Sequence, residues 1–118
     1  MSNPAKLLSG AWELLSGSYV GEDQTVLDYS QAGIKSLKVL SESKFSFVTT
    51  AQGVFYAACS GDFTAENGLY VEIPTLASHS DMIGKRFEFQ YRLEGDTWEN
   101  SRWQNNVRVE HEIWKRVR

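Results

Sequence analysis

Apolar and polar residues alternate along much of this chain, most clearly towards its C-terminal end. Between residues 85 and 94, four apolar side chains at every second position are separated by single polar ones. Strict alternation is typical of an antiparallel strand that buries one face and exposes the other. Gly95-Asp96 and Asn105-Asn106 are tight-turn sequences. The pattern therefore predicts strands at 85–94, 97–103 and 107–117, joined as a meander.

The rest of the chain contains further short apolar runs, separated by polar turn segments. They predict six more strands, at 10–20, 34–40, 45–50, 54–60, 61–65 and 69–73. Helix signals are weak: Asn3-Pro4 before 5–9 predicts one or two turns, and 75–83 at most one. The only long connection, 21–33, is expected to be a loop. Short connections favour an all-β, up-and-down antiparallel β-barrel of eight to ten strands with a short N-terminal helix over a sandwich.

Composition narrows the class of protein. The 118 residues suffice for a single domain, 1–118. Twelve basic against fifteen acidic residues argue against nucleic-acid binding, and no apolar run is long enough for a membrane helix. A lone cysteine, Cys59, expected to be a buried thiol, and no signal-like N-terminus predict a cytoplasmic protein. No phosphate loop, nucleophile elbow or metal-ligand spacing occurs, so we expect no metal and no cofactor.

Two short motifs carry a resemblance to a known superfamily. Gly10-Ala11-Trp12 follows the short helix, and Trp114-Lys115-Arg116 lies in the last predicted strand. This arrangement resembles the calycins, namely the lipocalins and fatty-acid-binding proteins, and especially small bacterial lipocalin-like domains of uncharacterised function. The resemblance implies a barrel whose floor is closed by Trp12 and whose interior holds a ligand.

The chain departs from fatty-acid-binding proteins in two places. The segment 21–33 is too short for their two-helix lid, so any lid is a loop. In the closing strand, Glu112 stands where the resemblance implies a carboxylate-binding arginine. An acidic residue there repels a fatty acid and favours a cation, a hydroxyl donor or a partner arginine such as Arg116.

The sequence leaves open which face of the last strand points into the barrel. Ordinary patterning would bury the face with Val109 and Ile113, whereas the calycin resemblance places Trp114 and Glu112 inside. The same ambiguity holds for Tyr70 and Glu72 against their apolar neighbours. If the polar face is inside, an apolar stripe remains outside and predicts a homodimer.

Three function hypotheses follow. The first is a protein that binds a small hydrophobic, amphipathic or aromatic molecule inside the barrel. The second is a barrel enzyme, an isomerase or hydrolase, using Glu72 and Glu112 as acid and base, together with His79 or His111. The third is a homodimeric interaction module with a filled barrel. The residues expected to contact the ligand are Trp12, Tyr56, Tyr70, Glu72, Tyr91, Glu112, Trp114 and Arg116.

Overall fold

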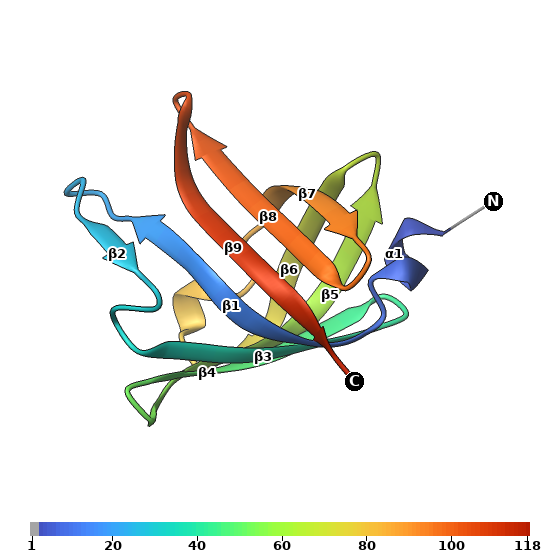
Figure 1. The fold of residues 1–118 in the computed structure, drawn as a ribbon, viewed down its shortest axis with the longest axis horizontal. Coiled ribbons are helices and arrows are strands. Elements are labelled where there is room, and N and C mark those ends of the chain that lie inside the picture. Colours follow the sequence, from blue (N-terminus) through green and yellow to red (C-terminus); the bar gives the residue numbers. More distant parts are fainter. Residues whose placement is uncertain (1–2) are drawn as a thin grey trace.

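A computed structural model describes residues 3–118 as an antiparallel β-barrel with one short helix (Figure 1). The elements are α1 (Pro4–Leu7), β1 (Gly10–Val20), β2 (Val26–Asp28), β3 (Ile34–Ser41), β4 (Lys44–Ala51), β5 (Val54–Glu66), β6 (Leu69–Ala77), the 3₁₀ turn η1 (Ser80–Met82), β7 (Phe87–Glu94), β8 (Thr97–Gln104) and β9 (Val107–Val117). The predicted all-β, up-and-down barrel with an N-terminal helix is confirmed. No helix within residues 3–118 has the length and apolar character needed to cross a membrane.

The barrel closes between its first and last long strands. Strands β3 to β9 pair in sequence order, and β1 pairs with β3 on one side and with β9 on the other. The β1–β9 pairing runs from Ala11↔Val117 to Tyr19↔Glu110. The short strand β2 pairs only with the end of β1, so eight strands form the closed wall and β2 is an appendage.

Two-residue turns with left-handed backbone set the register of the hairpins. Asn67 and Gly68 have φ of 53° and 78°, and Asn105 and Asn106 have φ of 51° and 66°. Asparagine and glycine tolerate this region, and such turns match the right-handed twist of the flanking strands. The predicted separators therefore act as hairpin turns.

The structure differs from the predicted elements in three places. The predicted strands 54–60 and 61–65 are one strand, β5, because a bulge between Ser60 and Gly61 replaces the expected break. A Cβ at Gly61 would lie 2.2 Å from the carbonyl oxygen of Ile73, so only glycine fits this close approach. Strand β6 continues past Ile73, through the buried Pro74 opposite that bulge, to Ala77. Part of the segment expected to be a loop, 21–33, forms β2.

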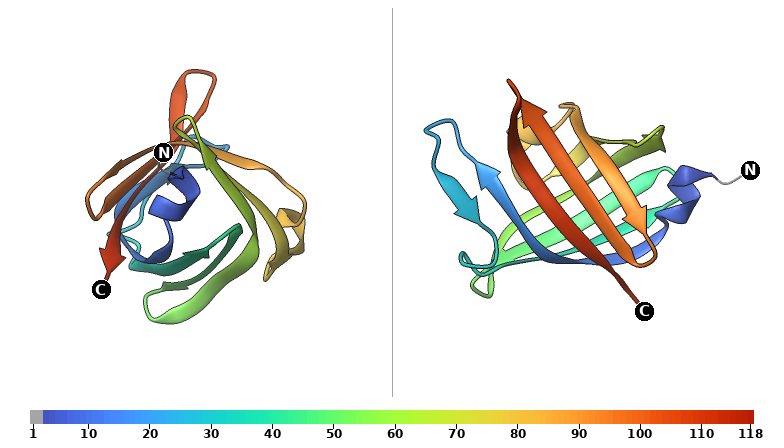
Figure 2. Two further views of the ribbon diagram at one scale, coloured as in Figure 1. Left: turned by 90° about the vertical axis from the view of Figure 1, so that its right-hand side faces the viewer. Right: turned by 45° about the horizontal axis from the view of Figure 1, so that its top comes forward.

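The helix α1 covers one end of the barrel (Figure 2). Leu8 and Trp12, both fully buried, form the floor there, and the indole nitrogen of Trp12 donates a hydrogen bond of 2.8 Å to the carbonyl of Leu8. The guanidinium of Arg116 lies 4.3 Å from the Trp12 ring centre and donates to the carbonyls of Ser9 and Leu7. Stacking and hydrogen bonds together hold α1 against the last strand.

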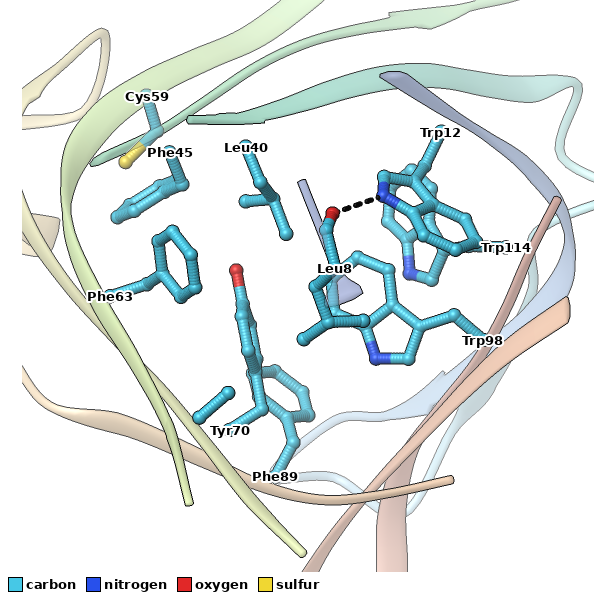
Figure 3. Packing of buried hydrophobic residues seen from close by; sticks show 11 residues of the cluster. Leu8, Trp12, Leu40, Phe45, Cys59, Phe63, Tyr70, Phe89, Trp98 and Trp114 are labelled. Carbon is cyan, nitrogen blue, oxygen red and sulfur yellow. Dashed lines mark hydrogen bonds between the residues drawn. The ribbon is translucent and has the colours of Figure 1, made fainter. Parts of the chain in front are cut away.

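An aromatic core fills the barrel above this floor (Figure 3). The fully buried Trp98 is central to it, with ring centres 5.3 Å from Trp12, 4.9 Å from Tyr70 and 6.0 Å from Trp114. The cluster comprises Leu8, Trp12, Leu40, Phe45, Cys59, Phe63, Ala65, Tyr70, Phe89, Trp98 and Trp114. The end of the barrel next to α1 is therefore packed with side chains.

Candidate functional site

The interior beyond the aromatic core is a cavity of about 480 Å³. It lies towards η1 and the β1–β2 end, opposite α1, and its base is formed by charged side chains and Trp114. The lining residues are Leu14, Tyr19, Leu27, Tyr29, Ile34, Ser36, Lys38, Phe47, Thr49, Tyr56, Ala57, Glu72, His79, Asp81, Met82, Phe87, Phe89, Glu110, Glu112 and Trp114.

The structure resolves the orientation of β9 that the sequence left open. Glu110, Glu112 and Trp114 line the cavity, as the calycin resemblance implied. On the other face, Val117 is exposed and Ile113 is half-buried. Val107 does not share their face, because the register shift between Arg102 and Trp103 pairs it with Gln104, on the same side of β8 as Arg102. The interior is therefore polar on this strand, and the apolar Ile113 and Val117 lie outside.

A buried ion pair joins β3 to β6 at the base of the cavity. Nζ of Lys38 lies 2.5 Å from Oε2 of Glu72, and both side chains are less than a tenth exposed. The hydroxyl of Tyr70 donates to the same carboxylate oxygen at 2.6 Å. Burial and the Glu72 charge raise the pKa of Tyr70, so the phenol keeps its proton and remains a donor.

Lys38 also lies among aromatic rings. Its Nζ is 4.8 Å from the ring centre of Trp114, 5.4 Å from Phe47 and 5.5 Å from Trp98. Burial opposes the charge of Lys38, but the negative charges of Glu72 and then Glu112 outweigh it and raise its pKa. The amine is therefore held as an ammonium ion.

Glu110 is the carboxyl whose protonation changes near neutral pH. It accepts hydrogen bonds of 3.1 Å from the Tyr29 hydroxyl and from Nε of Arg102. Burial and then the neighbouring charge of Glu112 raise its pKa to about 7, against the opposing effect of Arg102. Burial and Glu110 also raise the pKa of Tyr29.

Within the described part of the chain, the side chains that donate hydrogen bonds to Glu112 are neutral. Its Oε1 accepts from the indole nitrogen of Trp114 at 3.0 Å and from Nδ2 of Asn100 at 3.3 Å. Asn100 is fully buried, and its Oδ1 has no hydrogen-bond partner among residues 3–118. Arg116 bonds to Asp96 and to the floor instead, so the expectation that it could pair with Glu112 is wrong.

The mouth of the cavity combines exposed apolar side chains with a histidine. Tyr56 is 55% exposed and its ring centre lies 6.3 Å from that of His79, which follows β6. Leu27, in β2, lies on the rim. Pairing between β6 and β7 covers only Leu69–Glu72, beyond which η1 adds Met82 to the lining.

The structure brings together some of the residues predicted to contact a ligand and separates others. Tyr56, Glu72, Glu112 and Trp114 line one cavity, and Tyr70 binds Glu72 from below. Trp12 and Arg116 belong to the closed floor. Tyr91 in β7 is half-buried against the core and does not line the cavity.

Several charged and polar residues of the site were not predicted. Lys38, Tyr29 and Glu110 line the cavity, and Asn100 and Arg102 donate hydrogen bonds to its carboxylates. For Lys38 a signal existed, because it shares its side of β3 with the buried Leu40, two residues along. Tyr29 lies in the connection expected to be a loop, where no periodicity marks an inward side chain.

The other reactive side chains lie outside this network. Burial raises the pKa of Cys59 to about 11, so it is the inert thiol we expected. His111 lies 2.7 Å from Glu99, a contact that lowers the pKa of Glu99. Within residues 3–118 no three His, Cys, Asp or Glu side chains cluster to hold a metal ion.

Comparison of the sequence with models of known protein families and with curated proteins finds no match. The eight-stranded barrel, its short helix and the Trp12–Arg116 floor are compatible with a lipocalin-like fold.

The raised pKa of Glu110 predicts a pH-dependent stability. Because the folded state holds this proton more tightly than the unfolded state, the stabilisation is complete below the ordinary pKa of 4.5 and is lost as the pH rises through about 7. The free energy of unfolding should fall by about 2 kcal/mol between roughly pH 5 and pH 7 through Glu110. Urea unfolding across this range should show the decline in the wild type and lose it in Glu110→Gln.

The exposed Glu66 provides the control, since Glu66→Gln should leave the decline unchanged. Parallel curves for the wild type and Glu110→Gln would show that Glu110 titrates normally.

Proposed function

We propose that this protein binds a small amphipathic molecule, with an aromatic or other apolar body, inside the barrel. The observation that carries the proposal is the cavity of about 480 Å³, apolar along its walls and polar at its base. Ligand sites typically have this volume, with mainly apolar walls and a few placed polar groups. We also propose that the chain is a lipocalin-like member of the calycin superfamily.

The wall and the mouth support an apolar ligand body. Phe47, Phe87 and Phe89 line the cavity and supply aromatic surface to it. Exposed Tyr56 and Leu27 at the rim supply apolar surface along the way in. A ligand with its apolar part along this wall would place its polar end near Lys38, Glu72, Glu110 and Glu112.

Binding inside the barrel is tested by filling it. Thr49 lines the cavity, whereas Val48, its neighbour in β4, is 52% exposed. Nile red, a neutral dye that fluoresces in apolar surroundings, should bind the wild type and Val48→Trp with equal affinity. Thr49→Trp places an indole in the cavity and should weaken dye binding at least about tenfold.

Equal dye affinity for the wild type and both variants would overturn the proposal, since the dye would then bind outside the cavity. Failure of the wild type to bind the dye would also count against an accessible interior.

The other hypotheses stay predictions. For an enzyme, Glu110 is a better candidate for the acid or base than Glu72. Glu72 is bound by Lys38 and Tyr70, whereas the pKa of Glu110, about 7, suits proton transfer. For a homodimer, the outer face of β9 offers Ile113 and the exposed Val117. A cytoplasmic location also stays a prediction.

A further inference from the structure

The charges at the base of the cavity do not balance. Three carboxylates, those of Glu72, Glu110 and Glu112, lie at this base, and the fourth carboxylate of the lining, the exposed Asp81, lies in η1 at the mouth. Two cations face them: Lys38 is bound to Glu72 at 2.5 Å, and Arg102 to Glu110 at 3.1 Å. When all five groups are ionised, one negative charge remains.

That charge is associated with Glu112. Its two hydrogen bonds come from an indole and an amide, neither of which carries a charge. Ion pairing with a buried carboxylate is strong only when the geometry also satisfies its hydrogen bonds, and among residues 3–118 no cationic side chain forms an ion pair with Glu112. Burial and then the charge of Glu112 raise the pKa of Glu110 to about 7, so the extra negative charge is present above that pH.

A second observation points to a hydrogen-bond donor. Asn100 is fully buried, directly opposite Glu112 in the β8–β9 register, and its Oδ1 has no partner among the described side chains. Its Nδ2 donates to Glu112. Rotating the amide by half a turn would place Oδ1 against the Glu112 carboxylate, so that two acceptors would face each other. Next to Glu112 there is therefore an unused acceptor. The other buried side-chain atom without a partner among residues 3–118, the indole nitrogen of Trp98, belongs to the aromatic core.

From these observations we infer that the ligand carries a cationic, hydrogen-bond-donating group, an ammonium or amidinium, that ion-pairs with Glu112. The inference rests on the proposed function and names its ligand class. An anionic ligand would meet three carboxylates, and the ammonium of Lys38 is already bound to Glu72. A neutral alcohol could donate to Glu112 but would leave the charge uncompensated.

Three probes with one ring system test the ligand class. These are 1-naphthylmethylamine, 1-naphthalenemethanol and 1-naphthoate, which are a cation, a neutral donor and an anion near neutral pH. Calorimetric titration of the wild type should give the amine a dissociation constant about ten- to hundredfold below that of the alcohol, and the acid the weakest binding. In Glu112→Gln the preference for the amine over the alcohol should disappear.

A matched control removes the charge of Glu99, which lies in β8 next to Asn100. Glu99 contacts His111, does not line the cavity, and directly precedes Asn100. Glu99→Gln should keep the preference for the amine, which separates the ion pair with Glu112 from a general effect of net charge.

The outcomes separate this inference from the proposed function. If Nile red binding is blocked by Thr49→Trp but the wild type binds the amine no more tightly than the alcohol or the acid, the ligand class is wrong and the cavity proposal stands. If the dye does not bind inside, the proposed function itself has failed. Preference for the amine that persists in Glu112→Gln would likewise overturn the assignment to Glu112.

Discussion

Replacing Lys38 with methionine should destabilise the protein by about 3–5 kcal/mol, since removing one member of a buried ion pair leaves an uncompensated charge. The methionine fills a similar volume, so packing is largely kept. Glu72 would lose its counter-ion at 2.5 Å, and a positive charge near Glu112 would be removed. Urea unfolding followed by circular dichroism measures the change.

The double variant Lys38→Met/Glu72→Gln should recover much of this loss. The glutamine is uncharged and still accepts the hydrogen bond of Tyr70. The comparison pair is Lys44–Asp62, whose side chains are 69% and 49% exposed, and Lys44→Met should cost less than about 1 kcal/mol. A similarly small cost for Lys38→Met would show that the buried amine is not held as an ion.

Truncating the floor should have a comparable effect. Trp12→Ala should cost about 3–5 kcal/mol, the usual range for a buried aromatic residue. The indole has no exposed surface, packs 5.3 Å from Trp98 and 4.3 Å from the Arg116 guanidinium, and bonds to Leu8. Thermal and urea unfolding measure the loss of stability.

Trp103 is the matched control for this change. It is 50% exposed on β8, and the guanidinium of Arg108 lies 6.0 Å from its ring centre. Trp103→Ala should change the free energy of unfolding by less than about 1 kcal/mol. If Trp12→Ala were equally mild, the floor would not be the structural closure that the geometry indicates.

The sequence was most informative where local rules act. Alternation in 85–94 and turn pairs such as Asn105-Asn106 were sufficient to predict the meander and the class of barrel. The break expected between 54–60 and 61–65 was wrong, because a glycine at a bulge gives the same local sequence signal as a glycine in a turn. The sequence did not predict β2, because this strand is defined by its pairing with β1 and not by a local pattern of residues.

The site was only partly predictable, because a strand pattern gives two faces but not which one is inside. For β9, ordinary patterning predicted that the apolar face is buried, which was wrong. Only the calycin resemblance placed Glu112 and Trp114 in the interior. The partners of these residues come from other strands: Lys38 meets Glu72 across 34 positions of sequence and Tyr29 meets Glu110 across 81. Such contacts depend on register and closure, which no local pattern encodes.

The measurement that tests the account most directly is the nuclear magnetic resonance spectrum of the indole N–H groups during titration with 1-naphthylmethylamine. The four tryptophans report on different places: Trp114 donates to Glu112, Trp12 to Leu8 in the floor, Trp98 lies in the core and Trp103 is exposed outside. Tryptophan-to-phenylalanine variants assign the signals. A ligand inside the barrel at Glu112 should shift the Trp114 signal most and leave Trp103 in place, whereas a shift of Trp103 with Trp114 unchanged would contradict the account.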